Sequence, residues 1–201
     1  MMLEKALSSR TGIRLLRIFH SFPGRAFSLS DITRITGQST GAVYPALKRL
    51  VDSGMIRYSK VGKSAAYRLN AENLLVRKVM EIFSAETEML KNAARMFAKN
   101  VEKGGILSII LFGSVARGEP RETSDVDLLI VFRGNRESVE KNVNRLVEEY
   151  LKSDVYLAPV LYSEREIRDM YSHYNSFILK VEEEGVLLYG KPLRRIRYER
   201  D

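Results

Sequence analysis

The chain has 201 residues, of which 45% are hydrophobic and 29% are charged, and it contains no cysteine. No apolar run approaches the ~20 residues that span a bilayer, and the first residues lack a secretory-signal pattern, so the composition predicts a cytoplasmic protein. The absence of cysteine excludes a zinc finger, and His20 and His173 are too few for a histidine-built metal centre. Any metal is therefore expected to bind through oxygen.

The net charge of +8 is distributed unevenly along the chain. Residues 1–70 carry 12 Lys or Arg and 3 Asp or Glu, whereas residues 104–201 carry 15 and 17. This contrast indicates that the N-terminal part contacts a polyanion, although a solvated basic surface would give the same counts. The chain length predicts two compact domains.

The first third of the chain is predicted to form three helices and a β-hairpin. Apolar residues at helical spacing, bounded by capping or breaking residues, indicate helices over residues 11–20, 28–37 and 39–54. Pro45 lies inside the third helix and has no amide proton, which predicts a late helix start or a bend. Residues 55–60 and 65–70 have the composition of short strands and flank a turn that contains glycine.

The next segment, residues 71–103, is predicted to be one long connecting helix that ends at Gly104 and Gly105. We expect it to bury four apolar side chains against another domain or another chain. These are Leu75, Ile82, Met89 and Phe97. The helix is therefore also the predicted place for a homodimer interface.

Beyond residue 104 the apolar pattern alternates between strands and helices. The predicted strands cover residues 106–113, 126–132, 155–162 and 185–190, and the predicted helices cover residues 136–152 and 163–184. The basic tail after residue 190 is expected to be loosely held.

The third predicted helix and the hairpin suit duplex DNA, because a helix fits the major groove while a hairpin reaches the flanking backbone. The candidate DNA contacts are Thr40, Tyr44, Lys48 and Arg49 on the helix, and Lys60 and Lys63 on the hairpin. The string GAVYPALKRLVDSGMI resembles the recognition helix of PadR-type and related ArsR-like winged-helix regulators. The resemblance covers residues 11–70 and implies DNA binding as a dimer on a two-fold site. A protein-interaction module is the alternative.

A second motif, LFGSVARGEPRETSDVDLLIVF, occupies residues 111–132. Gly113 and Ser114 follow a buried strand, and glycine there lets backbone amides and a hydroxyl approach phosphate oxygens closely. Asp125 and Asp127 are two residues apart on a strand, so their carboxylates point to the same side and can share divalent cations. Mg²⁺ bridging carboxylate and triphosphate is the expected arrangement, and two-metal nucleotidyl transfer needs such clustered acids.

The Gly-Ser, Ala-Arg-Gly and Ser-Asp-Val-Asp elements together resemble the DNA polymerase β-type nucleotidyltransferases, including minimal, kanamycin nucleotidyltransferase-like and antitoxin-type members. The resemblance spans residues 88–190. It implies that Gly113 and Ser114 hold the nucleotide phosphates and that Arg117 assists them or orders the loop. It also implies that Asp125 and Asp127 are catalytic and bind Mg²⁺ or Mn²⁺ with a nucleoside triphosphate.

The two resemblances predict an α+β protein of two domains. A winged helix-turn-helix occupies residues 1–70, a connecting helix residues 71–103, and a nucleotidyltransferase-fold mixed sheet with helices residues 104–201. The nucleotidyltransferase family normally supplies a third carboxylate from a neighbouring strand. Neither side of the strand at 155–162 carries an acid at its middle. Asp154 precedes that strand, and it is either the third metal ligand or a strand-start or helix-cap residue.

Three functions of different classes follow from these motifs. The first is a DNA-binding transcriptional regulator whose nucleotidyltransferase-like domain binds Mg-nucleotide and biases DNA affinity. The second is an active nucleotidyltransferase that modifies a small molecule or a protein. The third is an antitoxin-like partner that binds a toxin and represses the shared operon. Turnover would favour the second function, and a toxin gene beside this one would favour the third.

Overall fold

The computed structural model describes residue 7 and residues 9–61, 64–118 and 125–198. The chain divides into two compact units, Met1–Ala85 and Glu86–Asp201. The boundary falls inside one long helix, α5 (Leu74–Asn100), which contributes side chains to a core in each unit. The structure is therefore α+β, with one helix shared by two separately packed units.

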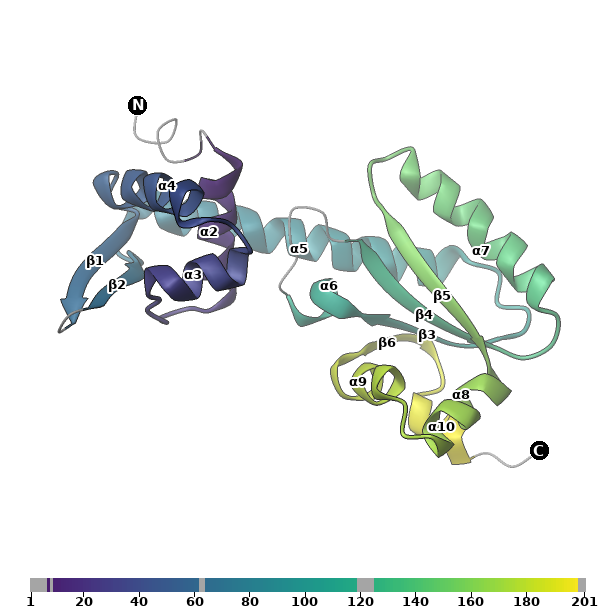
Figure 1. Ribbon diagram of the computed structural model, residues 1–201. Helices are drawn as coiled ribbons and strands as arrows, with labels where there is room; N and C mark the ends of the chain where they lie inside the picture. Colours follow the sequence, from purple (N-terminus) through teal and green to yellow (C-terminus); the bar gives the residue numbers. More distant parts are fainter. Residues whose placement is uncertain (1–6, 8, 62–63, 119–124, 199–201) are drawn as a thin grey trace. The chain divides into compact units, whose positions relative to one another are not determined.

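The first unit has winged-helix topology, with helices followed by an antiparallel hairpin (Figure 1). Its elements are α2 (Arg10–Ser21), α3 (Leu29–Thr36), α4 (Thr40–Asp52), β1 (Ile56–Val61) and β2 (Ser64–Leu69). Ser28 and Asp31 form a capping box at the start of α3, and Gly37 ends that helix in the left-handed conformation. These local signals explain why the predicted helix boundaries lie within a few residues of the observed ones.

Helix α4 begins at Thr40 and runs through Pro45, so the late start suggested by the proline is wrong. Ser39 precedes the helix in an extended conformation, and its carbonyl accepts the amides of Ala42 and Val43. The apolar side of α4 is buried in the core of the unit, as with Leu47. Burial of that side holds the helix despite the hydrogen bond that proline removes.

The four apolar residues predicted to be buried along α5 differ in their surroundings. Phe97 is fully buried in the second unit, and Leu75 packs partly buried against the core of the first. Ile82 and Met89 are 64% and 60% exposed. Burial within this chain is therefore confirmed for Phe97 and wrong for Ile82 and Met89, whereas their burial against another chain stays a prediction.

The second unit is built on a four-stranded mixed sheet in the order β5-β4-β3-β6. Its strands are β3 (Ile106–Phe112), β4 (Val126–Phe132), β5 (Leu157–Ser163) and β6 (Val186–Gly190). Strand β3 is antiparallel to β4 and β6, and β4 is parallel to β5. The short helix α6 (Gly113–Arg117) follows β3 directly.

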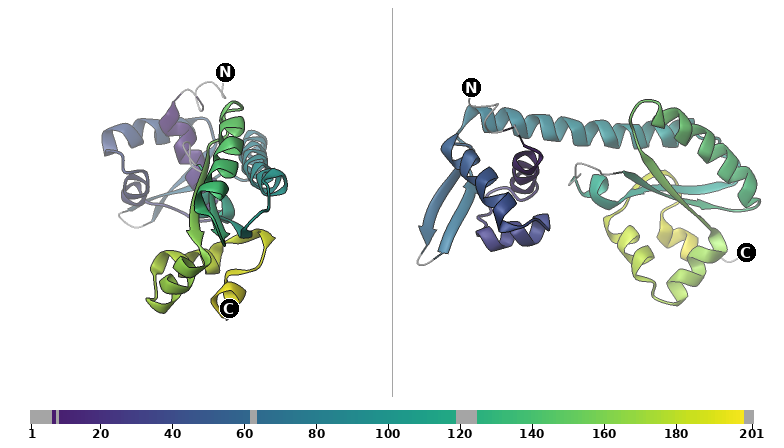
Figure 2. Two further views of the ribbon diagram at one scale, coloured as in Figure 1. Left: turned by 90° about the vertical axis from the view of Figure 1, so that its right-hand side faces the viewer. Right: turned by 45° about the horizontal axis from the view of Figure 1, so that its top comes forward.

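Helices cover both faces of this sheet (Figure 2). Helix α7 (Arg136–Leu151) and the end of α5 pack on one face, where Phe97 and Val143 join the strand residues. The other face is covered by α8 (Glu164–Ser172), α9 (Ser176–Glu184) and α10 (Leu193–Tyr198). Asp127 belongs to this second face, because it alternates with the buried Leu129 and Val131 along β4.

Two sequence-based expectations for the C-terminal part are corrected. The single helix expected over residues 163–184 is two helices, because Tyr174 has a left-handed φ of 51° and Asn175 caps a new helix by accepting the amide of Phe177. The tail expected to be loosely held instead forms α10 within the described residues. Leu193 and Ile196 anchor it by being buried against α8 and α9.

Candidate functional site

A pocket of about 460 Å³ opens in the second unit where β3, α6, β4 and α9 meet. It is lined by Phe112, Gly113, Ser114, Arg117, Asp127, Phe177, Lys180, Val181 and Glu184. The structure thus brings together four of the residues that the sequence motif singled out. The turn after β3 carries three of them, and the adjacent strand β4 carries Asp127.

The carboxylate of Asp127 lies against the backbone of Gly113. A Cβ atom added to Gly113 would lie 2.0 Å from Oδ2 of Asp127, far inside van der Waals contact. Gly113 also has a left-handed φ of 73°, which disfavours any other residue. Glycine is therefore required here by the neighbouring carboxylate and by the backbone turn.

Burial raises the pKa of the Asp127 carboxyl, and the negative charge of Asp125 raises it further. The positive charge of Arg117 acts in the opposite direction. A cation bound beside Asp125 and Asp127 would relieve the repulsion between their negative charges. Their oxygen donors are those that Mg²⁺ prefers.

The expected third carboxylate does not join this pair. In the parallel pairing of β4 and β5, Asp127 stands beside Ala158, and the next residue on that face is Val160. Asp154 is exposed in the loop before β5 and has a left-handed φ of 56°. Among the described residues, no three His, Cys, Asp or Glu side chains form a group that could hold a metal ion.

Helix α9 supplies pocket residues that the motif does not contain. Phe177, Lys180 and Glu184 line the pocket, and the Phe177 ring packs edge-on against Phe112 with centroids 5.4 Å apart. Glu184 accepts a hydrogen bond from the Arg117 guanidinium at 2.7 Å. The pocket lining therefore combines the charged groups of Lys180, Glu184 and Arg117 with the aromatic rings of Phe112 and Phe177. These α9 residues are far from the motif in sequence, so no sequence pattern linked them to the pocket.

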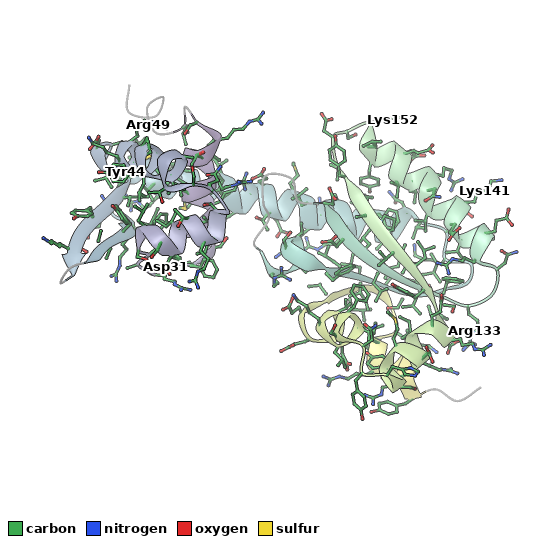
Figure 3. The ribbon with its side chains drawn as sticks, in the orientation of Figure 1. Asp31, Tyr44, Arg49, Arg133, Lys141 and Lys152 are labelled. Carbon is green, nitrogen blue, oxygen red and sulfur yellow. The ribbon has the colours of Figure 1, made fainter. Side chains whose placement is uncertain are left out.

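In the first unit, the predicted DNA contacts on α4 all lie on its exposed side. Thr40, Tyr44, Lys48 and Arg49 are exposed, and Figure 3 shows Tyr44 and Arg49 extending from this helix. Arg49 donates a hydrogen bond to Ser9 at 3.2 Å, which ties it to the start of α2. Lys48 is therefore the cation of α4 best placed for an external partner.

On the hairpin, Lys60 is exposed on β1, whereas Lys63 lies outside the described residues. Burial raises the pKa of Tyr67, and the neighbouring Tyr44 and Tyr58 raise it further. Tyr44 on α4 and Tyr58 on β1 are thus near the same residue, and both are about half exposed. Tyr58 shares its strand face with Lys60, and no sequence pattern singled out Tyr58.

Within the part of the chain that the structure describes, no helix combines the length and apolarity needed to cross a membrane.

Comparison with known proteins matches residues 94–188 to the nucleotidyltransferase domain family. A putative protein adenylyltransferase of Methanocaldococcus jannaschii is 33% identical over 109 residues, covering 53% of this chain and 98% of that protein. A second putative protein adenylyltransferase of that organism is 30% identical over 108 residues, covering 54% and 98%.

Among solved structures, the AntR antimony-specific transcriptional repressor aligns with 45% of this chain and 78% of its own, at 24% identity and a TM-score of 0.38. The alignments with these two Methanocaldococcus jannaschii proteins cover almost the whole length of each of them and about half of this chain. This chain therefore belongs to the nucleotidyltransferase family, whose domain it carries beside a unit of winged-helix topology.

Proposed function

We propose that this protein is a DNA-binding transcriptional regulator whose nucleotidyltransferase domain binds a nucleoside triphosphate with Mg²⁺ or Mn²⁺. The observation that carries the nucleotide site is the pocket in which Gly113, Arg117 and Asp127 meet. A nucleotide has a polyanionic end and a flat aromatic base. The charged groups of the pocket lining suit the first, and the rings of Phe112 and Phe177 suit the second.

Asp125 and Asp127 fit a divalent cation that arrives with the nucleotide. In nucleotide sites Mg²⁺ keeps several waters and is bound by one or two carboxylates together with substrate phosphates. The ion would supply charge neutralisation between triphosphate and carboxylates. Two acids are enough for this binding role, so the missing third carboxylate does not weaken it.

Duplex DNA is the proposed partner of the first unit, and the cytoplasm is the proposed location of the protein. The support is the exposure of Tyr44 and Lys48 on α4 and of Tyr58 and Lys60 on β1, with Tyr44 and Tyr58 both near Tyr67. Helix α5 contributes Phe83 to the core of this unit and Phe97 to that of the other. We propose that nucleotide binding biases DNA affinity through α5.

The regulator is further proposed to act as a homodimer through α5. Ile82, Met89 and Met96 recur at seven-residue intervals on one side of the helix and are exposed. Ala85 and Ala93 lie four residues to either side of Met89. This symmetric order of large and small residues suits an antiparallel second copy, because a two-fold interface pairs the same patch on both chains.

Nucleotidyl transfer to a protein is the second candidate function. The two archaeal relatives named putative protein adenylyltransferases favour it, because the match covers nearly all of both. The residue beside Asp127 argues against efficient turnover, since Ala158 cannot bind a second metal ion that activates an attacking hydroxyl.

Thermal unfolding of the full chain with each of the four ribonucleoside triphosphates, in Mg²⁺ and in Mn²⁺, tests the nucleotide site. A ligand at about 100 times its dissociation constant adds about 2.7 kcal/mol to stability. The wild type should gain this stability, and an Asp125→Asn, Asp127→Asn double variant should not. Absence of stabilisation by any triphosphate in either metal would reject the site.

A transfer assay separates the two candidate functions. The same two proteins are incubated with radiolabelled triphosphate, metal and cell extract. Strong labelling of an acceptor by the wild type that the double variant loses would favour the enzyme over the regulator. Release or tightening of DNA binding by triphosphate, without labelling, would favour the regulator.

A further inference from the structure

Two charged residues of α9 face the proposed nucleotide pocket. Lys180 and Glu184 are four residues apart, so they lie on one side of the helix, and both line the pocket beside Asp127. They have opposite charges. A triphosphate entering this pocket would therefore meet one attractive and one repulsive group from the same helix.

Glu184 already engages the arginine of the motif. The Arg117 guanidinium donates to Glu184 Oε2 at 2.7 Å, and the two side chains remain 34% and 30% exposed. An ion pair this accessible to water is held weakly, so another anion can replace the carboxylate. A phosphate that approaches Arg117 competes with Glu184 for the positive charge of the guanidinium and for the Nη1 N–H group that the carboxylate occupies.

Lys180 differs from Arg117 in having no hydrogen bond or ion pair to any residue that the structure describes. Its side chain is exposed at the pocket, four residues from Glu184. A lysine ammonium is a compact charge on a flexible stem, which allows it to follow phosphate oxygens. Lys180 can therefore contact a triphosphate without breaking an existing interaction.

We propose that Lys180 and Glu184 set the affinity of the pocket for nucleoside triphosphate in opposite directions. Lys180 contacts the terminal phosphates, and Glu184 competes with the phosphates for Arg117. The proposal rests on the proposed function of the pocket as a nucleotide site. Because the added phosphates of a triphosphate carry the interaction, both residues affect a triphosphate more than a monophosphate.

Calorimetric titration of the full chain with Mg-ATP and with AMP tests the proposal, with GTP, CTP or UTP substituted if thermal unfolding shows one of them to bind better. Lys180→Gln should weaken triphosphate binding by about tenfold, the effect of removing one charge-assisted hydrogen bond. Lys180→Arg should restore most of it. Glu184→Gln should tighten triphosphate binding several-fold, and neither change should alter AMP binding as strongly.

Two charge-matched variants serve as controls. Lys141→Gln removes an exposed lysine of α7 (Figure 3), and Glu183→Gln removes an exposed carboxylate next to Glu184 that does not line the pocket. Both should bind triphosphate as the wild type does. Thermal unfolding of every variant without ligand shows whether the fold is retained. A purely structural role of Glu184 predicts weaker binding in Glu184→Gln, opposite to the proposal.

The outcomes separate this proposal from the proposed function. If the wild type binds no triphosphate, the nucleotide site itself is wrong and this proposal falls with it. If the wild type binds but Lys180→Gln binds equally well, or Glu184→Gln binds more weakly, only the roles assigned to α9 are overturned. If Lys141→Gln and Lys180→Gln weaken triphosphate binding equally, the effect comes from the net charge of the protein, and the proposal is overturned as well.

Discussion

The carboxylate of Asp127 occupies the space that a side chain at Gly113 would need, since a Cβ atom there would lie 2.0 Å from Oδ2. The contact joins the turn after β3 to the start of β4. It explains why glycine and aspartate occur together in the motif although they are far apart along the chain. The turn at Gly113 must therefore fit over the Asp127 carboxylate even when no phosphate is bound.

Gly113→Ala should therefore abolish nucleotide binding and destabilise the second unit. Gly118 provides a matched control, because its φ of 79° resembles the 73° of Gly113 but an added Cβ atom would meet no atom of the described residues within 4 Å. Both variants lose about 1–2 kcal/mol from the left-handed backbone, whereas only Gly113→Ala displaces Asp127. Thermal unfolding with and without Mg-triphosphate distinguishes them, and equal nucleotide binding by both variants would contradict the assignment.

Ala158→Asp should strengthen divalent-metal binding and raise any nucleotidyl transfer. Ala158 is paired directly with Asp127 across β4 and β5, so an aspartate there adds a carboxylate to the same face. Added ligand charge raises metal affinity, and we expect Mn²⁺ to bind about tenfold more tightly. Ala158→Asn has the same shape without the charge. Mn²⁺ affinity and nucleotidyl transfer should rise in Ala158→Asp and not in Ala158→Asn. An equal rise in both variants would contradict the placement of residue 158 beside Asp127.

Replacing Lys48 or Lys60 by Gln should weaken DNA binding across all sequences and reduce the slope of log affinity against log salt by about 1 for each phosphate that is no longer neutralised. Tyr44→Ala should in addition change sequence preference, because its side chain extends from α4 (Figure 3). Fluorescence anisotropy at several salt concentrations measures both effects. Lys141→Gln, on α7, is the control, and a decrease in affinity there equal to that of Lys48→Gln would argue against a specific surface.

Met89→Glu should dissociate the proposed homodimer. Met89 is 60% exposed on α5 and would face its own copy in an antiparallel pair, where two carboxylates repel each other. Light scattering coupled to size-exclusion chromatography measures the mass. Glu88→Gln changes a neighbouring exposed residue and should leave the mass unchanged. A wild type that is monomeric at tens of micromolar would contradict this interface.

Acidification should destabilise the protein through His20. Burial lowers the pKa of His20 and the positive charge of Arg17 lowers it further, whereas unfolding restores the ordinary value of 6.5. The unfolded chain thus takes up the proton first. Stability from neutral His20 is fully present above about pH 6.5 and is lost as the pH falls through the folded-state pKa.

The His20 effect is measured as melting temperature against pH. His20→Gln should flatten the decline below about pH 6.5, because glutamine takes up no proton in either state. His173→Gln replaces an exposed histidine after α8 and should leave the decline as in the wild type. A decline in His20→Gln as steep as that of the wild type would assign the pH dependence to other groups.

The sequence by itself determined most elements of both units and four of the nine described residues that line the pocket. The Ser28–Asp31 capping box and Gly37 act within a few residues, so their signals are legible along the chain. Gly113 directly follows β3, and Asp127 lies on β4, the strand that pairs with β3. Their chemistry was predictable because it depends on spacing and residue type.

Only the tertiary structure decided which distant residues complete the pocket. Arg117 and Glu184 are 67 residues apart, and nothing local to either of them indicates the ion pair. The break at Tyr174 that separates α8 from α9 requires a left-handed residue that the helical pattern conceals. Similarly, the place of Ala158 beside Asp127 follows from strand register. Register and helix packing minimise the free energy of the whole core, so short-range patterns do not specify them.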